Sequence, residues 1–132
     1  MPELSETIKK FVEEKNLVHF VTLMKSGAPQ VTPVWVDHDG THILINTAEG
    51  RQKPRNLERN PRVALSIVDS ANPYRYIIGR GKVTEITREG AWDHICKLSE
   101  KYTGNVNYAG NPAETRIIIK VLLEHTSTRG LD

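Results

Sequence analysis

The sequence predicts an α+β protein: a mainly antiparallel six-stranded β-barrel with peripheral helices. Two patterns predict this class. Short segments rich in β-branched and aromatic residues are separated by tight turns, and segments with helical periodicity interrupt them at a few defined places. With 132 residues, the chain is expected to form a single domain over 1–132 that buries a core without disulfides.

The first element is predicted to be a helix that Ser5 caps. Its apolar residues Ile8, Phe11 and Val12 recur at intervals of three and four and so share one face. Asn16 ends the helix. This helix should pack on the barrel through that face.

Three strands are predicted next, at 17–24, 30–36 and 41–46, with turns at 25–29 and 37–40 between them. Gly40 supplies the positive φ that the second turn needs. Because short turns join neighbouring antiparallel strands, we expect a meander. Pro33 cannot donate to a ladder, so the second of these strands should lie at an edge or a bulge.

Three further strands and two helices are predicted in the second half. The strands cover 62–69, 74–86 and 116–124, and Gly79 and Gly81 indicate a bulge or bend in the middle one. Pro54 starts a short helix over 55–59. Thr87 caps a second helix that Gly104 closes. This helix carries one face made of Trp92, Ile95, Cys96, Ser99 and Tyr102.

The composition argues against several classes of function. Lys and Arg total 18 and Asp and Glu 16, a balance too even to predict a nucleic-acid partner. No apolar run is long enough to cross a membrane, and the N-terminus lacks the features of a signal peptide. Cys96 is the only cysteine and is expected in the core, and the histidines are too scattered to predict a metal site. We therefore expect a cytoplasmic protein.

The segment from Asn46 to Asn56 is the main candidate site. It combines a strand end, a glycine-containing loop, and the cations Arg51, Lys53 and Arg55 before a short helix, which are the components of a phosphate site. Arg51 and Lys53 point the same way if the loop is extended, whereas Pro54 turns Arg55 away. A solvated basic turn stays open as the alternative, because no glycine-rich phosphate fingerprint supports the site.

Other candidates are weaker. Pro33 breaks the ladder, and this could leave the amides of Val34 and Trp35 free to face a planar ligand, although the pattern alone favours an ordinary edge strand. Residues 74–76, Tyr-Arg-Tyr, could stack on a ligand or belong to the core or an interface. Arg116 and Arg129 are expected on the surface. No catalytic side chain is identified.

Several of these motifs resemble a known family. The motifs are Gly27-Ala28-Pro29-Gln30-Val31-Thr32-Pro33-Val34-Trp35-Val36, then Gly50-Arg51-x-Lys53-x-x-Asn56-Leu57-x-x-Asn60-Pro61, and Arg80-Gly81-x-Val83-x-Glu85-Ile86. Together they resemble the pyridoxamine 5′-phosphate oxidase-like superfamily of FMN-binding split barrels. More narrowly, they resemble its flavin/deazaflavin oxidoreductase branch, which is rich in members that depend on coenzyme F-420.

The resemblance implies a split-barrel homodimer with two cofactor sites at its interface. By position, Arg51 and Lys53 bind the cofactor phosphate, and Thr32, Pro33 and Val34 line its tricyclic ring. The other implied site residues are Asn46 and Thr47 beside the ribityl chain and phosphate, Gln52 and Asn56 supporting the loop, and Tyr74 and Tyr76 reaching the site from the partner subunit.

The function that follows from the resemblance is an oxidoreductase that uses F-420 to transfer hydride to a small conjugated acceptor. An FMN-binding oxidoreductase of the same fold is the alternative, because both cofactors need the same phosphate contacts. A flavin carrier or sensor without turnover also stays open, since no acid or base side chain is evident. Oxidation of pyridoxamine phosphate itself is not favoured, because the chain is short and no second phosphate-binding set is visible.

Overall fold

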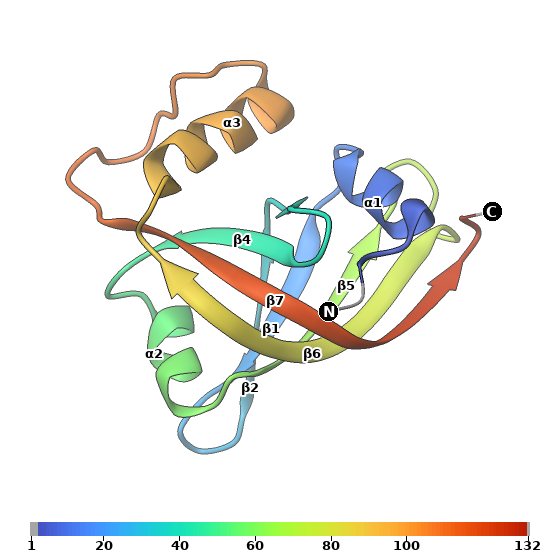
Figure 1. The fold of residues 1–132 in the computed structure, drawn as a ribbon, viewed down its shortest axis with the longest axis horizontal. Helices are drawn as coiled ribbons and strands as arrows, with labels where there is room; N and C mark the ends of the chain where they lie inside the picture. Colours follow the sequence, from blue (N-terminus) through green and yellow to red (C-terminus); the bar gives the residue numbers. More distant parts are fainter. Residues whose placement is uncertain (1–2, 132) are drawn as a thin grey trace.

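The fold is a single antiparallel sheet of seven strands, curled into a barrel that stays open between its two edges (Figure 1). The computed structural model describes residues 3–131. The strand order is β2-β1-β5-β6-β7-β4-β3, and three helices lie apart from one another around the sheet. The elements are α1 (Glu6–Glu13), β1 (Val18–Leu23), β2 (Pro29–Val34), β3 (Asp37–His38), β4 (Ile43–Ala48), α2 (Gln52–Arg59), β5 (Arg62–Val68), β6 (Tyr76–Thr87), α3 (Ala91–Thr103) and β7 (Arg116–Arg129).

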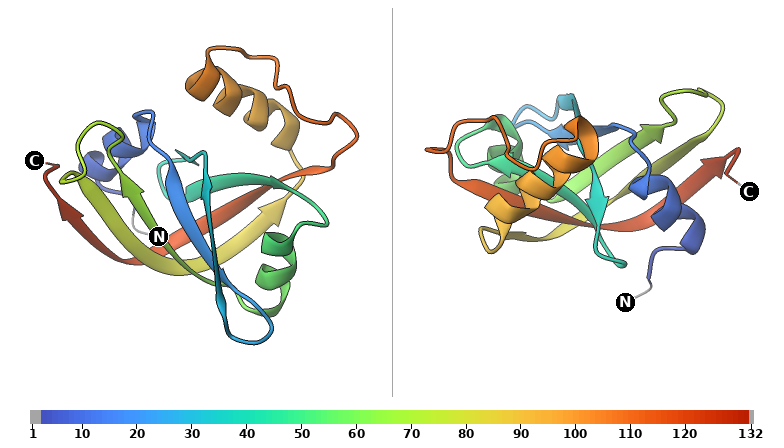
Figure 2. Two further views of the ribbon diagram at one scale, coloured as in Figure 1. Left: turned by 180° about the vertical axis from the view of Figure 1, so that it is seen from behind. Right: turned by 90° about the horizontal axis from the view of Figure 1, so that it is seen from above.

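The long strands β6 and β7 give the sheet its curl, and both bend along their length (Figure 2). Their register shifts between Arg80 and Gly81 and again between Val83 and Glu85, which confirms the predicted bulge. At Gly81 a Cβ would lie 1.9 Å from the carbonyl oxygen of Leu122. Only glycine therefore allows the two backbones to approach this closely.

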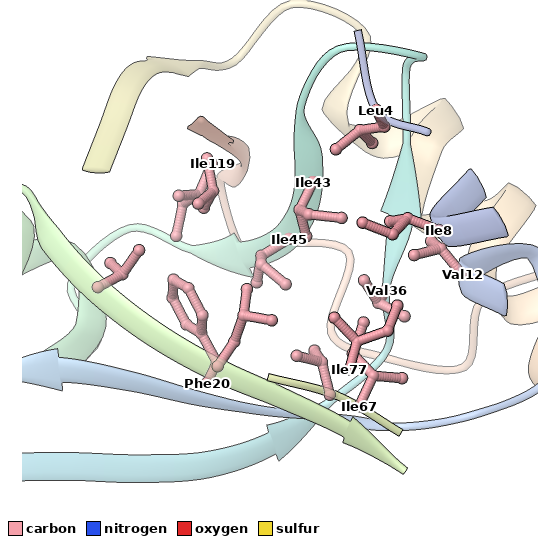
Figure 3. Close-up of a cluster of buried hydrophobic side chains, with 14 of the residues drawn as sticks. Leu4, Ile8, Val12, Phe20, Val36, Ile43, Ile45, Ile67, Ile77 and Ile119 are labelled. Carbon is pink, nitrogen blue, oxygen red and sulfur yellow. The ribbon is translucent and has the colours of Figure 1, made fainter. Parts of the chain in front are cut away.

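The hydrophobic core fills the inside of the curl (Figure 3). Its fully buried side chains come from five strands and include Phe20, Ile45, Ile67, Ile77 and Ile119. Helix α1 adds Ile8, Phe11 and Val12, the three residues of its predicted face. The amide of Ile8 donates to Ser5 Oγ at 3.2 Å, so the predicted cap is also confirmed.

The predicted meander of three strands is wrong. Strands β1 and β2 do form a hairpin, but β2 is the edge of the sheet, as Pro33 predicted. The chain then crosses to the opposite edge, where β3 and β4 follow and β4 pairs with β7. Turn chemistry identified the hairpins, but it carries no information on this long-range pairing. The site described below lies where the chain makes this crossing.

Element boundaries differ from the prediction in a few places. The two-residue β3 lies where a turn was expected, so the strands number seven rather than six, and β7 continues to Arg129. Helix α2 begins at Gln52 rather than at Pro54. Proline in a first turn removes no intrahelical hydrogen bond, so the helix can begin before it. Helix α3 begins at Ala91, because Thr87 Oγ1 accepts from Glu89 N in a turn before the helix.

Helix α3 covers the outer face of β4 and β7. Its buried residues are Ala91, Ile95, Leu98 and Ser99, and Ala91 packs with Leu44 and Ile118 in a second small cluster. The predicted face was right at Ile95 and Ser99 but wrong at Trp92, whose side chain is exposed, and Cys96 is only half-buried. Because α3 packs on the outside of the sheet, its polar residues can reach the open edge of the barrel.

The glycine at the bulge gives a direct test of the curl. We expect Gly81→Ala to lower the free energy of unfolding by at least about 2 kcal/mol, because the new methyl group meets backbone that cannot move aside. Gly79→Ala is the matched control, since its nearest neighbour at 3.0 Å is the flexible side chain of Leu123. Urea unfolding of both variants measures the difference, and equal losses would contradict the close-approach argument.

Candidate functional site

A cavity of about 320 Å³ opens at the end of β2. Pro33, Val34 and Trp35 form one wall, and residues of β4, α3, β7 and the loop after α3 form the rest. These other lining residues include Asn46, Ile95, Tyr108 and Arg116. The volume lies within the range that small-molecule sites occupy. The cavity therefore brings together Pro33, Val34 and Asn46, three of the site residues that the resemblance implies.

Aromatic side chains make the cavity wall flat and rigid. Trp35 stacks on Tyr102 with ring centroids 5.3 Å apart, and Tyr108 meets Trp35 edge-on at 6.2 Å. Tyr108 also meets Trp92 edge-on at 5.9 Å. Rings held in this way offer faces and edges on which a planar ligand can stack. From the sequence, Tyr108 was predicted to lie in a loop and was given no role, although it is the one aromatic residue of that loop.

Lys53 is a buried cation beside this cavity. It is 9% exposed, and its Nζ donates to Thr32 Oγ1 at 3.3 Å. Burial lowers the pKa of Lys53, and the positive charges of Arg51 and Arg116 lower it further. Within residues 3–131, no carboxylate forms an ion pair with it. A buried ammonium among like charges is costly, so this position favours an anion.

Arg51 and Arg116 share one carboxylate. Arg51 Nη2 donates to Glu114 Oε2 at 2.7 Å, and Arg116 Nη1 donates to Glu114 Oε1 at 3.2 Å. Together with Lys53 this leaves three cations around one anion, so two positive charges are not neutralised. Arg51 precedes the first residue of α2 and Lys53 is the second, so the loop is not extended through both of them and the condition for their shared direction is not met. The two charges converge through the start of the helix instead.

The prediction that Arg116 lies on the surface is wrong. Its side chain is 4% exposed, its Nε donates to Asn46 Oδ1 at 2.9 Å, and its guanidinium lies 5.3 Å from the centroid of the Tyr108 ring. In the part of the chain that the structure describes, Nη2 has no hydrogen-bond acceptor. One feature of the sequence could have indicated this burial: Arg116 directly precedes the apolar residues 117–119 of a core strand.

Helix α2 is tied to the sheet by the amide of Asn56, which is completely buried. Asn56 Nδ2 donates to Thr22 Oγ1 of β1 at 2.9 Å, and its Oδ1 accepts from Gln52 Nε2 at 2.7 Å. Arg59 also donates to Asn56 Oδ1, at 3.2 Å, and Arg55 donates to the carbonyl of Gly50. These contacts fix the start of α2, and hence Lys53, against the barrel.

Of the eleven predicted site residues, three line the cavity: Pro33, Val34 and Asn46. Five more lie on helix α2, at its start or against it: Thr32, Arg51, Gln52, Lys53 and Asn56. The remaining three, Thr47, Tyr74 and Tyr76, belong to neither group. Thr47 follows Asn46 on the strand, where neighbours point to opposite faces, and its buried Oγ1 has no hydrogen-bond partner among the described residues. Tyr74 is 72% exposed and precedes β6, and Tyr76 pairs with Arg129 at the far end of β6 and β7. Both tyrosines therefore lie at the opposite end of the β6–β7 pair from Arg116, which begins β7 and lines the cavity.

A histidine and an aspartate that sequence analysis did not select lie behind the cavity. His94 Nε2 is 3.0 Å from Asp37 Oδ2, and His94 Nδ1 is 3.1 Å from Asn46 Nδ2. Burial opposes ionisation of Asp37, but the hydrogen bonds from His94 and from the His38 amide, with the charge of Lys97, outweigh it and lower its pKa to about 2. No motif spacing in the sequence signals this pair, because its members are 57 residues apart.

The chain belongs to the pyridoxamine 5′-phosphate oxidase family, whose model matches residues 4–130. It is similar to the structure of an F-420 reductase, with 34% sequence identity, 96% of this chain and 98% of the other covered, and a TM-score of 0.80. A conserved hypothetical protein from Mycobacterium tuberculosis is 26% identical, with 96% and 84% covered and a TM-score of 0.77.

A more distant likeness shows the fold alone. The heme storage protein of Vibrio cholerae is 15% identical, with 98% of this chain and 97% of the other covered and a TM-score of 0.69. No match is found among curated proteins. In residues 3–131, no helix is long and apolar enough to cross a membrane, and no three His, Cys, Asp or Glu residues lie close enough to hold a metal.

The low pKa of Asp37 predicts a loss of stability in acid. Its ionised form stabilises the fold above about pH 4, and this contribution of about 2 kcal/mol disappears as the pH falls through about 2. Asp37→Asn should therefore be less stable than wild type at pH 7 by a similar amount, and the difference should shrink towards pH 2. Urea unfolding against pH measures this.

Asp93→Asn is the matched control, since Asp93 is exposed on α3 next to His94 and makes no side-chain hydrogen bond among the described residues. A gap between Asp37→Asn and wild type that stays constant from pH 7 to 2 would contradict the assignment.

Proposed function

We propose that the protein is an oxidoreductase that binds coenzyme F-420 at this site and transfers hydride to a small conjugated acceptor. One observation carries the proposal. Lys53 is a buried ammonium that has no carboxylate partner among the described residues. It feels the positive charges of Arg51 and of Arg116, and Arg116 lines the flat, aromatic cavity. This combination suits a planar ring joined to a phosphate.

The residues present fit such a cofactor. Lys53 and Arg51 would hold the phosphate, with Gln52 and Asn56 keeping the start of α2 in place. Thr32, Pro33 and Val34 would line the ring, because Pro33 and Val34 border the cavity and Thr32 contacts Lys53. Asn46 would lie beside the connecting chain. Thr47, which the resemblance also places there, is its neighbour on β4, but its buried hydroxyl lies on the opposite face of the strand.

Arg116 joins this set as a cation at the ring end of the cavity. Its unpartnered Nη2 can donate to a carbonyl or to negative charge on the ring edge. When bound, the cofactor supplies the hydride chemistry. The protein holds the ring against Trp35 and Tyr108, excludes water with this apolar wall, and places positive charge beside it.

F-420 is preferred to FMN because the F-420 reductase is 34% identical over nearly the whole of both chains. Absorption spectra of the purified protein, followed by titration with F-420 and with FMN, test the choice. We expect F-420 to bind with a micromolar or lower Kd. If FMN binds with that affinity and F-420 does not bind, the protein is an FMN-binding member of the family and the F-420 proposal is wrong. Binding of F-420 without reduction of any acceptor tried would favour the carrier or sensor.

Loss of single cations gives the second test. Lys53→Ala should weaken cofactor binding about ten- to a hundredfold, since a charge-assisted hydrogen bond to phosphate contributes about 1.5–3 kcal/mol. Arg51→Ala should act in the same direction but less strongly, because its side chain is 47% exposed. Lys82→Ala, an exposed cation on β6, is the control. Unchanged affinity in Lys53→Ala would overturn the phosphate assignment.

The homodimer with shared sites is part of the proposal. Tyr74 and Tyr76 lie far from the cavity of their own chain, so they can contribute only from a second copy. Sedimentation velocity should show a dimer, and Tyr76→Ala should weaken cofactor binding without changing that state. A monomer that binds the cofactor with full affinity would refute the shared-site arrangement.

A further inference from the structure

A chain of hydrogen bonds runs from the cavity through α3 to β3 at the edge of the sheet. Arg116 on β7 contacts Asn46 on β4 at 2.9 Å, Asn46 contacts His94 on α3 at 3.1 Å, and His94 contacts Asp37 on β3 at 3.0 Å. The side chains of Arg116, His94 and Asp37 are only 4%, 9% and 15% exposed. Water therefore has little access to these bonds, and each group depends on its protein partners.

The partners at the ends of the Asn46 amide fix its orientation. Asn46 Nδ2 lies 2.9 Å from the carbonyl oxygen of Ala91, which can only accept, and Asn46 Oδ1 lies 2.9 Å from Arg116 Nε, which can only donate. The second hydrogen on Nδ2 is therefore directed at His94 Nδ1. That nitrogen must carry a lone pair, so the imidazole is neutral with its proton on Nε2, where it donates to Asp37.

We propose that His94 is a positioning residue: its neutral, Nε2-protonated ring orients the Asn46 amide, which holds the Arg116 guanidinium at the cavity. The proposal rests on the proposed function, because Arg116 is the cation placed at the cofactor ring. His94 itself does not line the cavity and acts only through Asn46.

A second proton on His94 would break this arrangement. The new Nδ1–H would face the Nδ2–H of Asn46. Turning the amide over would direct Oδ1 at the carbonyl of Ala91 and Nδ2 at the Nε–H of Arg116, so both contacts would become repulsive.

The charged groups around His94 are Asp37 on β3, Lys97 on its own helix, 3.5 Å from Asp37, Lys101 one turn further along α3, and Arg116 beyond Asn46. Exposed Asp93 adjoins it in sequence. Protonation of His94 removes the contact by which the Asn46 amide holds Arg116. Affinity for the ligand should therefore fall in acid.

Two substitutions separate positioning from mere packing. His94→Asn keeps an acceptor oxygen near the place of Nδ1 but cannot titrate, so it should retain wild-type affinity at pH 8 within about threefold and keep it at pH 5.5. His94→Leu removes the acceptor and should weaken binding about three- to tenfold at every pH. His125→Asn, at an exposed histidine on β7 without side-chain bonds among the described residues, is the control.

The ligand-free protein gives the first readout. Nitrogen-15 NMR of the imidazoles should show the Nε2–H tautomer for His94 at pH 8. The Arg116 Nε–H signal should move as the pH falls in wild type and in His125→Asn, but not in His94→Asn. An Nδ1–H tautomer, or an Arg116 signal that ignores the pH in wild type, would overturn the proposal whether or not the protein binds a cofactor.

Titration with F-420, and with FMN in parallel, between pH 5.5 and 8 gives the second readout. The ratio of the Kd of wild type to that of His94→Asn removes the titration of the cofactor's own phosphate, which is common to both proteins. This ratio should rise in acid. A ratio that stays flat would refute the positioning role. If neither cofactor binds to wild type, the proposed function fails, and the NMR result alone decides the role of His94.

Discussion

The hydrogen bond from Arg116 Nε to Asn46 Oδ1 is the contact on which the arrangement of the site depends. It joins the two paired strands β4 and β7 at the point where the chain returns to the sheet after α3. A guanidinium that is 4% exposed loses several kcal/mol of hydration, which its partners must offset. Contacts with Asn46, Glu114 and the Tyr108 ring offset part of this lost hydration energy. A ligand that accepts a hydrogen bond from Nη2 would offset more of it.

The curl of the sheet makes this contact possible. The bulges on β6, which Gly81 permits, bend β6 and β7 around the core, and β2 and β3 form the two edges of the unclosed barrel. Pro33 limits ladder formation at the β2 edge, and Asn56 fastens α2 to the buried hydroxyl of Thr22 on β1. Lys53 is therefore held beside Thr32 although 21 residues separate them. Packing that is distant from the cavity thus fixes the geometry of its charges.

Sequence patterns predicted what depends on neighbours along the chain. Alternation, capping and turn residues gave the hairpin of β1 and β2, the cap at Ser5, the bulge at Gly81 and the basic segment at Arg51 and Lys53. They did not predict that β4 would pair with β7, because strand pairing at that distance depends on the whole core. Arg116 and His94 were missed for the same reason: an arginine becomes buried, and a histidine gains Asp37, only after the sheet has curled.

The basic segment at Arg51 and Lys53 can be predicted from the sequence, but it cannot identify the cofactor. In the proposed site, Arg51 and Lys53 would recognise charge on a phosphate, a group that FMN and F-420 share. A preference between the rings would then arise at the proposed ring position, at Trp35, Tyr108 and Arg116, none of which belongs to that segment. Asn46 connects the two regions, since it ends the strand before the basic loop and also contacts Arg116 and His94. The orientation of one amide therefore links the charge that faces the ring to the interior of the fold.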